Sequence, residues 1–296
     1  MDVLMSGATG LIGSALTPEL EAGGHRVRRL TRTPRSEGDI GWDPDAGTIA
    51  GDLAGTGAVV HLAGESIAEG RWTQEKKRRI LESRQKGTRL LAETVAGLPE
   101  PPSVMVSASA IGYYGDRGNE LLTEESGPGG LFLSRVCREW EAAAEPAREV
   151  GVRVVHPRLG IVLSTEGGAL GTTLPIFKLG GGGKIGSGRQ YWSWVSLDDV
   201  VGAIVHAIEN DALSGPVNVV GPDPPTNAEY TRVLGRVLGR PTFFAVPAPA
   251  ARVALGGMAD ELLLASARVE PAKLEETGYE YRYPELEGAL RHLLRR

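Results

Sequence analysis

The chain has 296 residues, a formal net charge of −5 and 23% charged residues, without a long basic block. This balance disfavours nucleic acid as a partner, and the length suits one large domain with a smaller second lobe. No apolar run approaches the about 18 residues of a membrane span, so we expect a cytoplasmic protein without a signal peptide or a membrane partner. Cys137 is the single cysteine and the five histidines lack ligand spacing, so we expect neither a disulfide nor a metal site.

The first predicted elements are a strand over residues 3–5, a glycine turn and an amphipathic helix over 11–22. In the turn, the first glycine permits a tight bend, the second lets a pyrophosphate approach the backbone, and the third lets helix and strand pack closely. The spacing is GxxGxxG rather than the usual GxGxxG. Free N–H groups at the helix start would bind the pyrophosphate, through Gly7, Thr9, Gly10, Leu11, Ile12 and Gly13.

The second predicted strand, over residues 25–31, bears on which dinucleotide is bound. A cofactor without a 2′-phosphate calls for Asp or Glu near the end of this strand, but the first acid downstream is Glu37. Arg32 stands there instead, and a guanidinium matches a phosphate bidentately. The sequence therefore predicts NADP, with Arg32 on the 2′-phosphate. The alternative is a solvated basic edge formed by Arg28, Arg29, Arg32 and Arg35.

Strands and helices then alternate along the chain, as in a doubly wound sheet. The expected elements are a strand over 58–62, a helix over 73–98 capped by Thr73, a strand over 103–107, a helix over 131–150 and a strand over 152–155. We take the charges of the 73–98 helix as a solvated face. Strand ends face the ligand crevice, which adds Leu62, Ala63, Gly64 and Ser107 to the predicted cofactor contacts.

The fold class predicted is α/β, a Rossmann-type doubly wound parallel sheet with a smaller C-terminal substrate lobe. We place the NADP-binding domain at residues 1–165, with strands and helices after 190 returning to it. Residues 166–296 would form mainly the substrate lobe, including a small C-terminal domain from about residue 245.

In the second half, residues 156–163 read as a strand leading into a long loop, where Arg158 is either a cofactor contact or an ion-pair residue. Four glycines before Lys184 do not form a Walker motif, and a mobile loop over the substrate is expected. Asp198 and Asp199 are expected to cap a helix running to residue 209. Aromatic and amide side chains would either stack on a substrate or pack the lobes together: Gln190, Tyr191, Trp192 and Trp194.

Several motifs together carry a resemblance to a known family: residues 7–13, 61–64, 87–91, 107–115 and 194–199. This combination resembles the extended and atypical short-chain dehydrogenases/reductases. It is most similar to the nucleoside-diphosphate-sugar epimerase-like branch sometimes labelled as a cell-division inhibitor, through residues 41–44, 109–115 and 186–194. The stretch beyond about residue 245 resembles the small C-terminal domain of these proteins.

The resemblance implies hydride transfer assisted by a Tyr-x-x-x-Lys pair on a helix and a Ser or Thr at the preceding strand end. Here Leu133 and Cys137 occupy the Tyr and Lys positions, and a shift of one residue gives Phe132 and Val136. Neither pair can transfer a proton in the family's manner. The standard mechanism is therefore not carried over to this chain.

Residues near the strand end offer substitutes for proton transfer. Ser109 lies near the family's serine position, although a one-residue difference in loop length would put Ala110 there. Tyr113 and Tyr114 follow in a glycine-flanked loop, where a hydroxyl could donate to a developing oxyanion. The alternative is that both rings merely wall the crevice.

Two functions follow from these observations. The first is an NADP-dependent oxidoreductase or epimerase of atypical mechanism, acting on a small carbonyl or sugar-like substrate. The second is an NADP(H)-binding regulator or scaffold without turnover.

Overall fold

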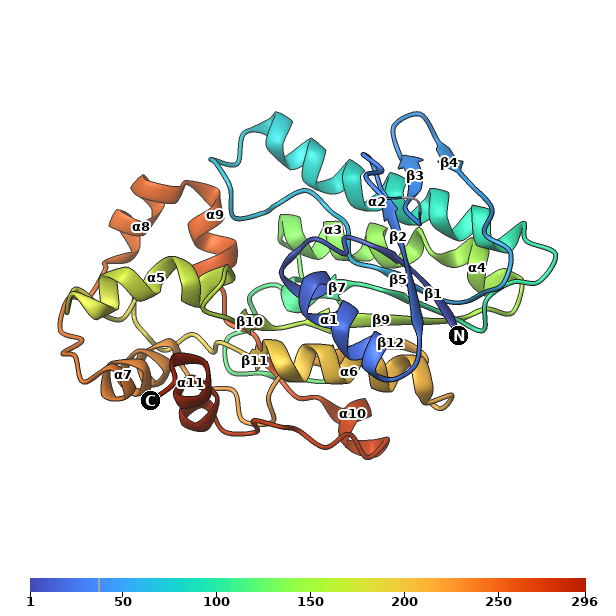
Figure 1. The fold of residues 1–296 in the computed structure, drawn as a ribbon. Helices are drawn as coiled ribbons and strands as arrows, with labels where there is room; N and C mark the ends of the chain where they lie inside the picture. Colours follow the sequence, from blue (N-terminus) through green and yellow to red (C-terminus); the bar gives the residue numbers. More distant parts are fainter. Residues whose placement is uncertain (37) are drawn as a thin grey trace.

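A computed structural model describes residues 1–36 and 38–296 (Figure 1), so Glu37 lies outside the described residues. The main sheet has the strand order β12-β9-β6-β5-β1-β2-β3-β4, with β7 also paired to β9. All pairs are parallel except β3 with β4. The strands are β1 (Asp2–Ser6), β2 (Arg26–Thr31), β3 (Ile40–Asp43), β4 (Thr48–Ala50), β5 (Thr56–His61), β6 (Val104–Ser107), β7 (Ser109–Ala110), β9 (Arg153–Leu159) and β12 (Gly215–Val219).

The strand order reverses its direction of growth between β1 and β5, which is the switch point of a doubly wound sheet. Ligands of such sheets bind outside the carboxyl ends of the strands at this point. The predicted fold class is confirmed. The glycine turn after β1 and the end of β5 are thereby brought to the same edge.

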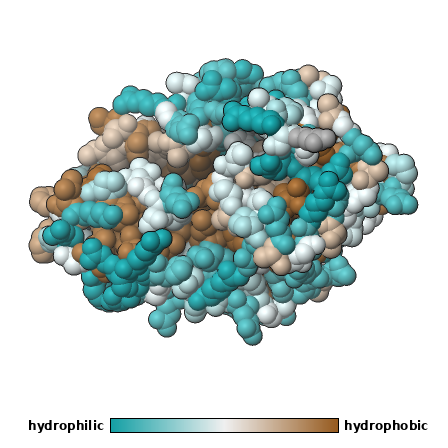
Figure 2. Space-filling model, viewed as in Figure 1, coloured by the Kyte–Doolittle hydropathy of each residue, from teal (hydrophilic) through white to brown (hydrophobic). Residues whose placement is uncertain are grey.

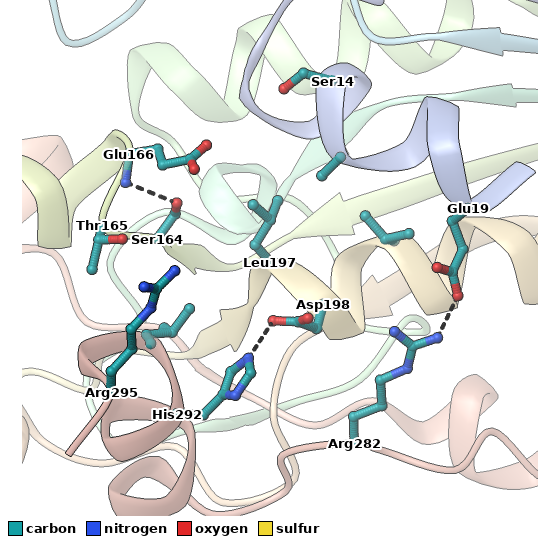
Figure 3. Close-up of a pocket in the computed structure, with 13 residues that line it drawn as sticks. Ser14, Glu19, Ser164, Thr165, Glu166, Leu197, Asp198, Arg282, His292 and Arg295 are labelled. Atoms are coloured by element: carbon teal, nitrogen blue, oxygen red, sulfur yellow. Dashed lines mark hydrogen bonds and ion pairs between the residues drawn. The ribbon is translucent and has the colours of Figure 1, made fainter.

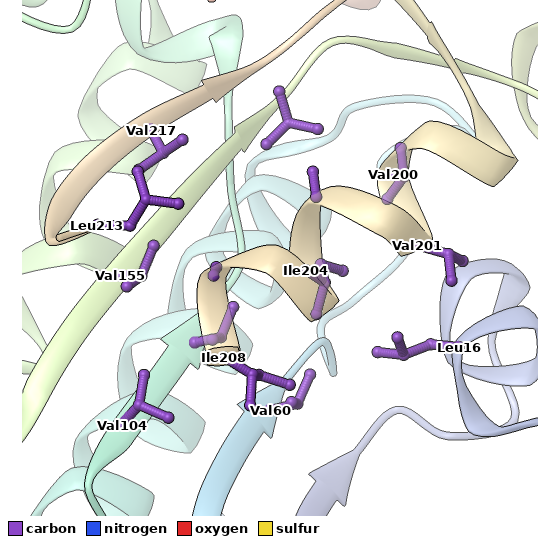
Figure 4. Close-up of a cluster of buried hydrophobic side chains, with 14 of the residues drawn as sticks. Leu16, Val60, Val104, Val155, Val200, Val201, Ile204, Ile208, Leu213 and Val217 are labelled. Carbon is purple, nitrogen blue, oxygen red and sulfur yellow. The ribbon is translucent and has the colours of Figure 1, made fainter. Parts of the chain in front are cut away.

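Helices cover both faces of the sheet (Figure 1). One face carries α1 (Leu11–Ala22) and α6 (Leu197–Glu209), and the other carries α2 (Gln74–Ala96), α3 (Phe132–Ala142) and α4 (Glu145–Glu149). The core under α6 joins strand residues such as Val60 and Val104 to Ile204 and Ile208 (Figure 4). None of the helices described is both long and apolar enough to cross a membrane.

A second core lies at the other end of the molecule and is built around Trp192 and Trp194. It collects side chains from α5 (Gly168–Lys178), α7 (Asn227–Leu238) and α11 (Leu286–Leu294). The remaining shorter elements of this half of the molecule and its connections are β8 (Leu121–Leu122), β10 (Ile161–Leu163), β11 (Trp194–Ser196), α8 (Ala248–Leu255), α9 (Gly257–Ala259), η2 (Asp260–Leu264), β13 (Arg268–Val269) and α10 (Ala272–Glu276), of which α10 packs against β12.

Some predicted boundaries were wrong. The helix expected over 131–150 is two helices, because Pro146 lacks an N–H group and starts α4 anew. The strands expected over 152–155 and 156–163 instead form β9, which continues through Pro157, and β10. Ser196 caps α6 by accepting from the Asp199 N–H at 3.0 Å, so the predicted capping role of Asp198 and Asp199 is corrected.

Candidate functional site

Two glycines of the turn after β1 are required by the protein's own packing. Gly7 has φ 74°, and a Cβ there would lie 2.9 Å from the backbone N of Ala63 at the end of β5. A Cβ on Gly13 would overlap the carbonyl oxygen of Gly7. These positions let α1 pack tightly against the strands, as the sequence predicted.

Gly10 differs from both because a Cβ there would make one tight contact with the backbone but would not overlap it. Its φ is −78°, its position is exposed, and the nearest atom to an added Cβ is the Gly7 oxygen at 3.3 Å. Gly10 is also the N-cap of α1, and no side chain caps this helix. The N–H groups of the first turn therefore have no side-chain acceptor among the described residues, which suits an anion.

Arg32 follows β2 directly, and its side chain is exposed. Neighbouring arginines are engaged, since Arg28 donates to the Ala54 carbonyl at 3.3 Å and Arg29 pairs with Asp39 at 3.1 Å. Within residues 1–36 and 38–296, no hydrogen bond or ion pair involves the guanidinium of Arg32. The guanidinium of Arg32 therefore presents donors near the glycine turn that no described residue occupies.

A positively charged side chain that the sequence analysis missed lies beside the end of β5. Arg84 of α2 donates to the Glu65 carbonyl at 2.9 Å, and its guanidinium lies 4.9 Å from the Trp140 ring centroid. A Cβ on Gly64 would be 3.2 Å from Arg84 Cζ. Burial lowers the pKa of Arg84. Its helical spacing from the buried Ile80 was the available signal, because residues four apart share one face.

Leu133 and Cys137, which the predicted register places at the family's Tyr and Lys positions, offer no proton-transfer group in the structure. Leu133 is buried and packs against Gly112, whose added Cβ would lie 3.1 Å from Leu133 Cβ. Burial raises the pKa of Cys137 to about 11, and its thiol donates to the Ala110 carbonyl at 3.5 Å. The thiol is therefore neutral near pH 7 and cannot replace the positive charge of a lysine.

A buried polar network connects the strand end to α3. Glu141 accepts from Ser109 Oγ at 2.7 Å, and from Arg158 Nε and Nη2 at 2.9 Å each. The third contact of Arg158 is the hydroxyl of Tyr114, which accepts from Nη1 at 3.0 Å. Sequence analysis left Arg158 between a cofactor contact and an ion pair, and the structure shows the ion pair. Ser109 donates its proton inside this network.

The three candidates for proton transfer therefore differ in availability. The Tyr114 side chain is fully buried, its hydroxyl donates to Asn218 Oδ1 at 2.7 Å, and burial raises its pKa to about 12. Tyr114 is thus corrected from a candidate to a packing residue, because its hydroxyl cannot reach a substrate. Tyr113 is partly exposed, and its ring centroid lies 3.5 Å from Arg158 Cζ. Its hydroxyl has no hydrogen-bond partner among the described side chains and backbone.

The aromatic and amide candidates of the second half are held in packing contacts. Trp194 is 1% exposed and Trp192 is 9% exposed, both within the second core. Gln190 is buried and donates to the carbonyls of Ile185 and Leu263. This placement favours the packing alternative over stacking on a substrate. Ser107 is likewise fully buried.

A hollow of about 550 Å³ lies between α1, α6, the segment 164–166 and α11 (Figure 3). Its lining holds two ion pairs, Glu19 with Arg282 and Asp198 with His292, the latter at 3.5 Å, together with Glu166 and Arg295. A lining with both acidic and basic side chains does not favour an anionic ligand over a cationic one. We therefore assign the candidate site to the sheet edge and not to this hollow.

Comparison with known proteins shows the family of this chain. The model of the NAD dependent epimerase/dehydratase family matches residues 3–221, and a domain of unknown function, DUF1731, matches residues 246–293. An epimerase family protein of Mycobacterium bovis is 42% identical over 97% of this chain and 96% of its own length. The crystal structure of human epimerase family protein SDR39U1 with NADPH has a TM-score of 0.93 and 37% identity, covering 100% of this chain and 99% of that one.

A more distant structure, UDP-N-acetylglucosamine 4-epimerase from Bacillus cereus, has a TM-score of 0.77 and 18% identity, covering 99% of this chain and 98% of its own. At this identity the likeness extends to the fold alone. The predicted resemblance to epimerase-like short-chain dehydrogenases/reductases is confirmed by the family match and the closer relatives. This chain belongs to the NAD dependent epimerase/dehydratase family.

Proposed function

We propose that this protein binds NADP(H) and acts as an oxidoreductase or epimerase of atypical mechanism on a small carbonyl or sugar-like substrate. The observation that carries the proposal is the exposed start of α1 at Gly10, which no side chain caps, with Arg32 at the end of the neighbouring strand, where no described residue binds its guanidinium. The human relative with NADPH, similar over the whole chain, supports the same choice of cofactor.

The residues present fit this cofactor. Backbone N–H groups at the start of α1 would hold the pyrophosphate, and Arg32 would pair with the 2′-phosphate. Arg84 would place a positive charge beside Cys137, where the family has its lysine. When bound, NADPH supplies a hydride. Contacts with the turn and strand ends complete the proposed site: Gly7, Thr9, Gly10, Leu11, Ile12, Gly13, Leu62, Ala63, Gly64 and Ser107.

For proton transfer we propose Tyr113. Its hydroxyl is the unengaged one of the three candidates in the described strand-end loop, and Arg158 fixes its ring from the face. Ser109 would act through its contact with Glu141, holding the loop in place. A donor within hydrogen-bond reach of a developing oxyanion lowers the barrier to hydride transfer.

The alternative is an NADP(H)-binding regulator or scaffold without turnover. It is favoured by the apolar Leu133 and the neutral Cys137, which leave the family's proton-transfer positions without a polar group. The two functions share the cofactor site and differ in the role of Tyr113. The tests below separate them.

The choice of cofactor is tested by Arg32→Ala. We expect NADPH to bind the unchanged protein at least about tenfold more tightly than NADH, which is about 1.4 kcal/mol, because the 2′-phosphate pairs with Arg32. Arg32→Ala should remove this preference in a fluorescence titration. Arg26→Ala is the matched control, since Arg26 lies at the other end of β2. Equal affinities for both cofactors in the unchanged protein contradict the proposal.

Turnover is tested by Tyr113→Phe, after screening carbonyl compounds for NADPH oxidation. We expect turnover to fall by about 10²-fold or more, within the range of general acid catalysis, with NADPH affinity nearly unchanged. Tyr283→Phe removes a hydroxyl from a tyrosine that stacks on His292 in the second lobe, and should be silent, as should Cys137→Ala. Full activity of Tyr113→Phe refutes this assignment. A protein that binds NADPH but oxidises it with no carbonyl compound favours the regulator.

A further inference from the structure

The end of the molecule that holds the second core, around Trp192 and Trp194, carries a cluster of exposed apolar side chains. Nine large hydrophobic residues are exposed in the described part of the chain, and six of them belong to three neighbouring segments of this end. Leu179 is 89% exposed and Phe243 is 85% exposed. We call this cluster the tip surface and define it by Ile176, Leu179, Phe243, Phe244, Val246 and Val253.

Backbone contacts hold the segments of the tip surface together. Phe244 N donates to the Gly182 carbonyl at 3.3 Å, and Val246 N donates to the Lys184 carbonyl at 2.8 Å. A Cβ on Gly183 would overlap the carbonyl of Phe244. The glycine segment that the sequence suggested as a mobile loop is thus packed against residues 243–246. The apolar side chains are therefore presented outward from a paired scaffold.

The charge of these segments is one-sided. Residues 176–189 and 239–255 contain five basic residues and no acidic residue, although the whole chain has a net charge of −5. The five are Lys178, Lys184, Arg189, Arg240 and Arg252, and all are exposed. Arg252 pairs with Asp260 at 2.8 Å, and the other four have no ion pair among the described residues. An anionic, partly apolar partner would match both features.

We propose that the tip surface docks this protein onto an anionic lipid bilayer. Phe243, Phe244 and Leu179 would enter the boundary between headgroups and acyl chains, while the lysines and arginines contact lipid phosphates. A symmetric pair of chains is a poorer occupant, because a two-fold interface would place the basic residues of each patch against themselves. In Figure 1 the α5, α7 and α8 elements form one end of the molecule, and Figure 2 shows apolar surface there.

This proposal departs from the sequence expectation of no membrane partner. That expectation rested on the lack of a long apolar segment, which excludes a span and does not address binding to the surface. The apolar residues lie in three separate segments, so no window of the sequence reveals their clustering. The proposal is independent of the proposed enzymatic function.

The proposal is tested by measuring the binding of the protein to lipid vesicles in a flotation assay, with no NADPH present. We expect binding to vesicles of 70% phosphatidylcholine and 30% phosphatidylglycerol, at least about tenfold tighter than to phosphatidylcholine alone, since each basic residue contributes about fivefold. Combining Phe243→Ser with Phe244→Ser should weaken binding by about tenfold or more. Combining Lys178→Glu with Arg240→Glu should remove the preference for anionic vesicles. Circular dichroism confirms that each variant is folded.

Two controls carry matched changes elsewhere. Leu121→Ser with Val150→Ser removes exposed apolar side chains outside the tip surface, and Arg26→Glu with Arg135→Glu makes the same change in net charge. Both should bind as the unchanged protein does, within about twofold. The proposal is overturned by absence of vesicle binding, by equal binding to both compositions, or by tip variants that bind like the controls. A dimer in solution that Phe243→Ser dissolves would also overturn it, in favour of a second copy.

Discussion

Valine in place of Gly10 is expected to abolish NADPH binding in a protein that still folds. We expect affinity to fall by at least about a hundredfold, or ~2.7 kcal/mol, because the branched side chain fills the space in which the pyrophosphate would lie. The fold should survive, since Gly10 has φ −78° and its Cβ position meets no protein atom closer than 3.3 Å. Fluorescence titration measures the affinity, and thermal unfolding measures the stability.

Gly13→Ala is the matched control for this experiment. Its added Cβ overlaps the Gly7 carbonyl oxygen, so α1 must move away from the turn and stability should fall by about 1–3 kcal/mol, the usual cost of overpacking. The two variants separate a glycine needed by the ligand from one needed by the fold. A folded Gly10→Val protein that binds NADPH with unchanged affinity would place the dinucleotide elsewhere.

We expect Glu141→Ala to lower the free energy of unfolding by about 3–5 kcal/mol, because it leaves a buried charge without its partner. The Arg158 side chain is 3% exposed, and both of its bonds to a carboxylate go to Glu141. Ser109 loses its acceptor in the same variant. Urea unfolding of the variant and the unchanged protein gives the difference directly.

The same helix supplies the control for Glu141. Glu139 pairs with Arg135 at 2.7 Å on the surface of α3, where the arginine is 62% exposed. Glu139→Ala should cost no more than about 1 kcal/mol, because water screens an exposed pair. Similar losses in both variants would show that the Glu141–Arg158 pair is no more important to stability than a surface ion pair.

Local sequence signals predicted much of the fold correctly. The strand before the glycine turn, helix α1 and the Thr73 cap of α2 all occur where they were expected, with Thr73 accepting from the Lys76 N–H at 3.1 Å. Each depends on residues within a few positions of one another, so a short window contains the cause. Longer predictions failed at a local breaker, as at Pro146, which divides the helix expected over 131–150.

The hairpin of β3 and β4 and the edge strand β12 were not predicted as strands. These strands are short, from three to five residues, and β12 pairs with β9, about sixty positions earlier in the chain. A short strand at the edge of a sheet depends on its partner as much as on its own side chains. The sequence pattern of such a strand is therefore weak evidence that a strand is present.

The sequence by itself determined the family resemblance, the doubly wound fold class and the glycine turn, because these depend on short motifs and on the alternation of strands and helices. The tertiary structure decided which polar groups are available. Tyr114 and Tyr113 are adjacent in sequence, yet Asn218 and Arg158 engage the first hydroxyl and leave the second open. Asn218 and Arg158 lie more than forty positions from Tyr114 in the chain, so neighbouring residues of the same type can have opposite roles for reasons that no short window contains.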